Sequence, residues 1–122
     1  MVILLVEDDV SVQLLIWKSL KADGFTILTA GDGEVALEES RNHSGSIDLL
    51  LSDVQLPLMS GLELCEKISA ERPGIKVLMM SGDPSVREQV SMHGLPFIQK
   101  PFTPTSLRDS IEALISPISP LP

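Results

Sequence analysis

Apolar residues along the chain fall into two alternating patterns. Short continuous apolar runs are separated by longer stretches in which apolar residues recur every three or four positions. The short runs predict strands and the longer stretches predict helices. The runs are Val2 to Val6, Phe25 to Thr29, Ile47 to Ser52, Ile75 to Met80 and Pro96 to Gln99. Because strands that alternate with helices form a parallel sheet, the pattern predicts an α/β protein.

The five runs also predict the order of the strands. The first, third and fourth are mostly apolar, whereas Phe25 to Thr29 is mixed and Pro96 to Gln99 is short and contains a proline. Continuous apolar runs belong inside a parallel sheet, and mixed or proline-containing runs belong at its edges. With the second and fifth strands at the edges, the sheet has the order 2-1-3-4-5. This is the order of a doubly wound, flavodoxin-like sheet with helices on both faces. This order places the binding crevice where the carboxyl ends of strands one and three meet.

Helical spacing and capping residues mark several of the predicted helices. The first helix is expected to have an apolar face formed by Val12, Leu15, Ile16 and Leu20. The last helix is expected to have one formed by Leu107, Ile111, Leu114 and Ile115. Asp32, Asp83 and Thr103 each stand where a helix is expected to begin. A side-chain oxygen at such a position accepts hydrogen bonds from the unpaired amides of the first helical turn.

Length and charge limit the classes of function. With 122 residues the chain has the size of one domain, which we place at residues 1 to 116, followed by a proline-rich and serine-containing tail or linker stub at 117 to 122. The net charge of −8 argues against direct binding of nucleic acid, which needs clustered Lys and Arg. No apolar run reaches the roughly 20 residues that cross a bilayer, and no basic leader follows Met1, so we expect a cytoplasmic protein without membrane contact.

Polar residues follow four of the predicted strands at their carboxyl ends. They are Glu7, Asp8, Asp9, Asp53, Ser81 and Lys100. Because the carboxyl ends of parallel strands lie at one edge of the sheet, we expect these side chains to converge there. Close carboxylates repel one another, so a shared proton or a bound cation has to relieve them. A small number of hard oxygen ligands suits Mg²⁺, which keeps several waters and is completed by the phosphates of a substrate.

Four short motifs stand at these strand ends. They are Ile3-Leu4-Leu5-Val6-Glu7-Asp8-Asp9, Asp53-Val54-Gln55-Leu56-Pro57-Leu58-Met59-Ser60-Gly61, Met80-Ser81-Gly82 and Lys100-Pro101-Phe102. In their order and spacing they resemble the four signatures of the response-regulator receiver domain of two-component signalling, in the CheY-like superfamily. The resemblance covers residues 1 to 115. It implies a bacterial phosphorelay protein that is switched by phosphorylation of one aspartate.

The resemblance implies a phosphoacceptor and a set of metal ligands. Asp53 would accept the phosphoryl group, and Mg²⁺, for which Mn²⁺ could substitute, would be held by Asp53, Glu7, Asp8 and the backbone carbonyl of Gln55. Asp8 would bind the metal directly and Glu7 through water, while Asp9 matches a variable position of the family. A metal is physically reasonable here because a phosphoryl group in transit spreads negative charge over its oxygens.

Further roles follow from the resemblance for residues around the acceptor. Lys100 would pair with the acceptor carboxylate and then with the phosphoryl oxygens, and the Ser81 hydroxyl would bond to the phosphoryl group. Phe97 stands at the family's aromatic switch position, where the alternative is a statically buried phenylalanine. Gln55 and Asp83 stand at the two positions that tune hydrolysis of the phosphorylated state, although Asp83 could instead cap the fourth helix. The Lys100-Pro101 bond is cis in the family.

The resemblance also implies partners. The phosphodonor would be a phosphohistidine of a sensor histidine kinase or of a histidine phosphotransfer protein, and a homodimer could form through the fourth helix, the fifth strand and the fifth helix. The chain would be no enzyme in the ordinary sense, but a switch that assists its own phosphorylation and dephosphorylation. A stand-alone regulator, the receiver of a transcription factor and the receiver of a hybrid kinase all remain open.

Three other functions fit the architecture less well. A flavin or nucleotide site would need glycines, amides or hydroxyls after the first strand, where the acidic residues would repel a phosphate. A metal-dependent phosphohydrolase with Asp53 as nucleophile would need a second acid or base and room to bind a substrate. A degenerate receiver that acts as a constitutive interaction module is disfavoured, because each position of the acceptor site holds a competent residue.

Overall fold

The protein folds as a five-stranded parallel sheet with helices on both faces, and the computed structural model describes residues 1–115. The predicted tail at 117 to 122 lies outside the described residues, and the domain boundary near residue 116 stays a prediction. Within residues 1–115, no helix is long and apolar enough to cross a membrane. The elements in chain order are β1 (Val2–Val6), α1 (Val10–Ala22), β2 (Thr26–Ala30), α2 (Gly33–Asn42), β3 (Leu49–Asp53), α3 (Gly61–Glu71), β4 (Lys76–Ser81), a 3₁₀ turn (Pro84–Val86), α4 (Arg87–Met92), β5 (Phe97–Gln99) and α5 (Pro104–Ile115).

The strand order β2-β1-β3-β4-β5 confirms the predicted flavodoxin-like topology. All four strand pairs are parallel, and each observed strand begins and ends within two residues of its predicted run. Every residue of β3 is buried, whereas β2 and β5 at the edges are partly exposed, as their mixed composition predicted. Burial on both sides therefore explains why the central strands are continuously apolar.

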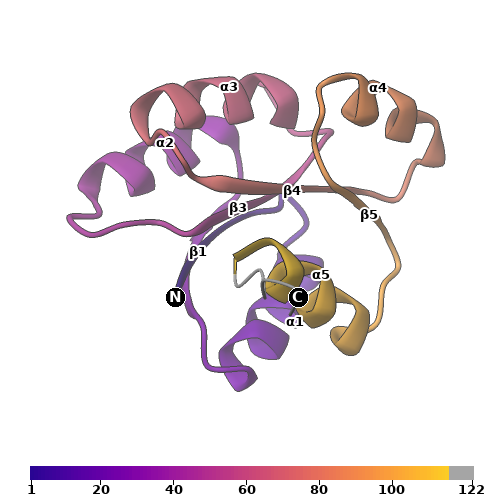
Figure 1. Cartoon of the computed structure of the whole chain (residues 1–122), viewed down its shortest axis with the longest axis horizontal. Helices are drawn as coiled ribbons and strands as arrows, with labels where there is room; N and C mark the ends of the chain where they lie inside the picture. Colours follow the sequence, from indigo (N-terminus) through magenta and orange to yellow (C-terminus); the bar gives the residue numbers. More distant parts are fainter. Residues whose placement is uncertain (116–122) are drawn as a thin grey trace, which may run out of the picture.

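Alternate residues of each central strand enter different cores, one on each face of the sheet. In β1, Leu4 and Val6 pack with α2, α3 and α4, whereas Ile3 and Leu5 pack with α1 and α5. Figure 1 shows the same division, with α2, α3 and α4 on one side of the sheet and α1 and α5 on the other. The sheet is thus held from both sides, which fixes the ends of its strands.

Helical spacing predicted a wrong position for Leu15 of α1. Leu15 is 69% exposed, while Ile16 and Leu20 are buried and Val12 is partly buried against the core. Successive helical residues are about 100° apart, so Leu15 lies beside the stripe that faces the sheet rather than on it. On α5 the four expected residues all pack against the core on this face.

The capping residues predicted for three helix starts are confirmed. Asp32 accepts a hydrogen bond from the amide of Val35 at 2.8 Å, and Thr103 accepts one from the amide of Ser106 at 3.0 Å. Asp83 accepts from the amide of Ser85 at 2.9 Å, although the element that it caps begins as the 3₁₀ turn. The Lys100-Pro101 peptide is cis, as expected from the family resemblance.

Gly61 is required where α3 begins, because the backbone there lies against the end of β3. Its amide donates to the carbonyl of Val54 at 2.8 Å, and a Cβ at this position would stand 1.9 Å from the carbonyl oxygen of Asp53. Gly61 does not have a positive φ; the positive φ in this loop belongs to Leu58, at 68°. Close approach of two backbone segments is therefore the reason for the glycine.

We expect Gly61→Ala to lower the free energy of unfolding by about 2 to 3 kcal/mol, because the added methyl group forces α3 away from β3. Gly31→Ala is the matched control, since no atom lies within 4 Å of the Cβ that it would add. The control should stay within about 0.5 kcal/mol of the wild type in chemical denaturation. Equal stability of the two variants would show that the contact at Gly61 does not constrain the loop.

Candidate functional site

The candidate site is built by the carboxyl ends of four neighbouring strands. Glu7 follows β1, Asp53 ends β3, Ser81 ends β4 and Lys100 follows β5. The strand register aligns the carboxyl ends of β3, β4 and β5, because Asp53 pairs with Met80 and Ser81 pairs with Gln99. The amide of Lys100 donates to the carbonyl of Ser81 at 2.9 Å, which anchors the lysine beside β4. The predicted convergence of these residues is therefore observed.

Three carboxylates lie together at this edge. One oxygen each from Glu7, Asp8 and Asp53 lies within 4.8 Å of the others. The Glu7 and Asp53 residues are only 2% and 5% exposed, whereas Asp8 is exposed to solvent. Two buried acids and one accessible acid form a set of hard oxygen donors that is open on one side. This donor set fits Mg²⁺, which binds few protein ligands and keeps water in its remaining positions.

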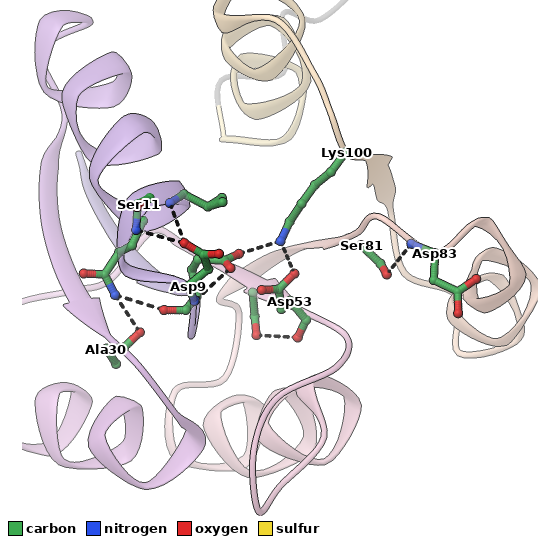
Figure 2. A network of polar contacts seen from close by, with 11 residues as sticks. Asp9, Ser11, Ala30, Asp53, Ser81, Asp83 and Lys100 are labelled. Carbon is green, nitrogen blue, oxygen red and sulfur yellow. Dashed lines mark hydrogen bonds and ion pairs between the residues drawn. The ribbon is translucent and has the colours of Figure 1, made fainter.

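Lys100 bridges the two buried acids. Its Nζ atom lies 2.6 Å from Oε2 of Glu7 and 2.6 Å from Oδ1 of Asp53. Figure 2 shows the lysine side chain reaching toward Asp53. The lysine side chain is only 20% exposed, so most of it is shielded from solvent. Such short charge-assisted hydrogen bonds hold the lysine in place and offset part of the repulsion between the acids.

The environment favours a proton on Asp53 in the absence of a cation. Burial raises the pKa of Asp53 to about 8, and its contact with Glu7 adds to the rise, while Lys100 opposes it. For Lys100, burial alone would lower the pKa, but the hydrogen bonds to Asp53 and Glu7 outweigh burial and raise it. The contacts with the two acids thus favour the charged form of Lys100, whereas burial disfavours charge on Asp53.

A family comparison agrees with this geometry. The model of the response regulator receiver domain matches residues 3–112, which is nearly the whole described chain.

The chain belongs to the response regulator receiver domain family.

Relatives of this receiver occur in several kinds of protein. The probable transcriptional regulatory protein TcrX of Mycobacterium tuberculosis is 32% identical over 104 residues, which cover 83% of this chain and 44% of TcrX. A solved receiver domain of the hybrid histidine kinase CckA is 32% identical, with a TM-score of 0.79 over 92% of this chain and 96% of that one. A CheY-like receiver protein of Methanospirillum hungatei is also 32% identical, with a TM-score of 0.81 over 91% of this chain and 90% of that one. The chain spans about half, or less, of the curated relatives that it matches.

Ser81 and Asp83 lie at one side of the receiver's Lys100–Asp53 pair, as Figure 2 shows. The Ser81 hydroxyl accepts a hydrogen bond from the amide of Asp83 at 3.0 Å and is buried. Hydrogen bonds from Ser85 lower the pKa of Asp83, and a side-chain contact with Gln55 adds to the effect. Asp83 therefore does cap the turn, which was the alternative to its tuning role, and it also lies next to Gln55. Both tuning roles stay predictions.

Phe97 is partly buried on β5, and its ring is covered by an arginine. The guanidinium carbon of Arg87 on α4 lies 5.2 Å from the centre of the ring, a cation–π distance. Two roles stay predictions: the switch role of Phe97 and a homodimer through α4, β5 and α5. Amide exchange on that face, measured with and without a phosphoryl mimic, would test them. Identical exchange in the two states would argue against both.

Two residues beside the acidic pair have roles that the sequence did not predict. Asp9 accepts hydrogen bonds from the amides of Ser11 and Val12, and so caps α1 directly beside the acidic pair. An aspartate just before a helix is a recognisable capping signal, so this role could have been found. Gln13 contacts the backbone of Glu7 from the first turns of α1. A lone glutamine on a helix gives no signal of such a contact.

Proposed function

We propose that this receiver is a Mg²⁺-dependent phosphoacceptor switch in which Asp53 takes the phosphoryl group. The observation that carries the proposal is the contact of Lys100 with both Asp53 and Glu7 beside a three-carboxylate cluster. A lysine between acids supplies positive charge where a phosphoryl group would bring negative charge. No other part of residues 1–115 gathers three acidic, cysteine or histidine side chains in this way.

The residues that would hold the metal are Glu7, Asp8, Asp53 and the backbone carbonyl of Gln55. The exposed Asp8 carboxylate is suited to direct binding, whereas Glu7 is occupied by Lys100 and suited to contact through water. When bound, Mg²⁺ or Mn²⁺ would neutralise charge on the carboxylates and on the phosphoryl oxygens.

In the proposed reaction, an ionised oxygen of Asp53 attacks the phosphorus of a phosphohistidine. The new phosphorus–oxygen bond forms as the phosphorus–nitrogen bond breaks, and the electron pair of that bond leaves with the imidazole. Lys100 then transfers its contact from the acids to the phosphoryl oxygens, and the Ser81 hydroxyl donates to another of them. Asp53 is well placed for this role, because the fully buried β3 fixes its backbone.

The proposed phosphodonor is a sensor histidine kinase or a histidine phosphotransfer protein. The relationship to the receiver of the hybrid histidine kinase CckA supports a partner of this class, and the relationship to TcrX leaves an output in transcription open. A partner of either kind supports our proposal that the receiver works in the cytoplasm.

We expect Asp53→Asn to abolish phosphoryl uptake from a small phosphodonor such as acetyl phosphate with Mg²⁺. The amide is nearly the same size but is a poor nucleophile, so the fold should be retained. Intact mass should show one added phosphoryl group on the wild type and none on the variant, with Asp9→Asn as a control that keeps uptake. Phosphoryl uptake by Asp53→Asn at the wild-type rate would contradict the assignment of Asp53 as the phosphoacceptor. Hydrolysis of the donor by the wild type without an adduct would favour a phosphohydrolase.

We expect Asp8→Asn to weaken Mg²⁺ binding by at least about 10-fold and Asp9→Asn by less than about 3-fold. Both changes remove one exposed charge from the same loop, but only Asp8 belongs to the carboxylate cluster. Asparagine also caps helices well, so Asp9→Asn should leave α1 intact. The affinity can be measured by the rise in melting temperature with Mg²⁺ concentration. Equal loss in the two variants would show a long-range charge effect and no coordination by Asp8.

We expect Gln55→Ala to lengthen the lifetime of the phosphorylated state by ~3 to 30-fold, equal to about 0.7 to 2 kcal/mol of barrier. The Gln55 side chain is exposed and contacts Asp83 beside Ser81, where its amide could orient an attacking water. Mg²⁺ affinity should hardly change, since the metal would use the backbone carbonyl. The matched control is Leu58→Ala, which trims a 94% exposed side chain of the same loop. A lifetime for Gln55→Ala no longer than that of the wild type would exclude the guiding role.

A further inference from the structure

We propose that Gln13 is a positioning residue that holds Glu7 and Asp8 in the arrangement that binds the metal. The inference rests on the proposed function, because it concerns the affinity of the same carboxylate cluster. Its basis is a pair of hydrogen bonds from one side-chain amide to the backbone of Glu7, just after β1, and of Ala30, at the end of β2. Gln13 itself touches neither of the acidic side chains.

The backbone pairing between β1 and β2 ends at the point where Gln13 acts. Val6 and Ala30 are the last paired residues, and the amide of Glu7 donates to the carbonyl of Ala30 at 3.1 Å. Beyond this bond the chain turns toward α1, and the carbonyl of Glu7 no longer faces a strand. Gln13 supplies the missing donor, since its Nε2 atom lies 3.1 Å from the Glu7 carbonyl oxygen.

The same nitrogen also lies 3.1 Å from the carbonyl oxygen of Ala30, and Figure 2 shows Ala30 at this junction. Both acceptors are carbonyl oxygens, so only the NH₂ end of the Gln13 amide can face them. Its two hydrogens are thereby both used. The side chain thus joins the last residue of β2 to the first residue after β1 and extends the pairing of the two strands by one step.

The loop around Asp8 is consequently fixed at both of its neighbours. On one side Gln13 and Ala30 hold the backbone of Glu7. On the other side the amide of Asp9 donates to Oε1 of Glu7 at 3.2 Å, and the carbonyl of Asp9 accepts from the Gln13 amide at 2.8 Å. Gln13 therefore contacts the loop twice, through its side chain and through its backbone. The position of the exposed Asp8 carboxylate follows from these contacts.

This fixation matters because the acids repel one another. Without the side-chain contact, the loop can move so that Glu7 and Asp8 separate in the metal-free protein, and the metal then has to bring them together again. Residues that orient metal ligands from behind contribute on the order of 10-fold or more to affinity. We therefore expect Gln13→Met, which keeps the length and the helix propensity but not the donor, to weaken Mg²⁺ binding by about 10-fold.

The test combines a binding measurement with a kinetic one. The dissociation constant for Mg²⁺ is measured by calorimetry, and phosphorylation by acetyl phosphate is followed at increasing Mg²⁺ concentration. For Gln13→Met the Mg²⁺ concentration that gives half of the maximal rate should rise about 10-fold, while the maximal rate stays within about 2-fold of the wild type, because Asp53 and Lys100 are unchanged. Gln89→Met, the same exchange at an exposed position of α4, should alter neither quantity.

A second variant separates positioning from charge. Gln13→Glu has the same shape but places carboxylate oxygens against two carbonyls, and its negative charge would by itself attract Mg²⁺ more strongly. Weaker binding by this variant therefore supports the geometric role, and binding as tight as that of the wild type overturns it. If metal-free Gln13→Met had a lower melting temperature but an unchanged Mg²⁺ affinity, Gln13 would stabilise the fold without positioning the metal ligands. This result would also overturn the proposal. If the wild type itself neither bound Mg²⁺ nor took up a phosphoryl group, the proposed function would fail instead.

Discussion

The repulsion between carboxylates at the end of the sheet is the constraint on which the rest of the site depends. Three acids lie within reach of one ion, and two of them are almost completely buried. Charges in such a position are costly unless a proton or a cation accompanies them. Lys100 provides part of the compensation from the end of β5, but burial still raises the pKa of Asp53, so the compensation is incomplete. The metal-free site is therefore short of positive charge.

The fold can keep such a cluster together because the acids are attached to its most rigid part. β3 is buried along its whole length, and separate cores support the sheet on each face. The loops that carry the remaining groups are fixed by local contacts: Asp9 caps α1, and the start of α3 lies directly against the end of β3 at Gly61. Stability gained in the two cores thus offsets the unfavourable electrostatics at the edge of the sheet.

The sequence predicted those features that a periodic pattern or a strand end encodes. Strand order followed from which runs were continuously apolar, and the convergence of Glu7, Asp53 and Lys100 followed from parallel topology alone. Leu15 was misplaced because helical spacing leaves the width of the buried stripe undetermined. The roles of Gln13 and Gly61 depend on distances between different elements of the fold, and neither apolar periodicity nor the position of a strand end carries that information. The contact of Arg87 with Phe97 likewise joins two elements of the fold and could not be predicted from the sequence pattern.

Charge balance gives the proposed switch its physical cause. Glu7, Asp8 and Asp53, when ionised, carry three negative charges and Lys100 one positive charge, which leaves two negative charges for a divalent cation to neutralise. Phosphorylation replaces the single charge of the Asp53 carboxylate by a group of about −1.5 to −2, so the balance is lost again. Lys100 would then have a stronger partner than Glu7. Its movement would disturb the end of β5, which it directly follows, and the end of β4, where its amide donates to Ser81. Phe97 lies on the short strand β5 under Arg87 of α4, which is why we propose the α4 and β5 surface as the place where a change at the acceptor would be felt.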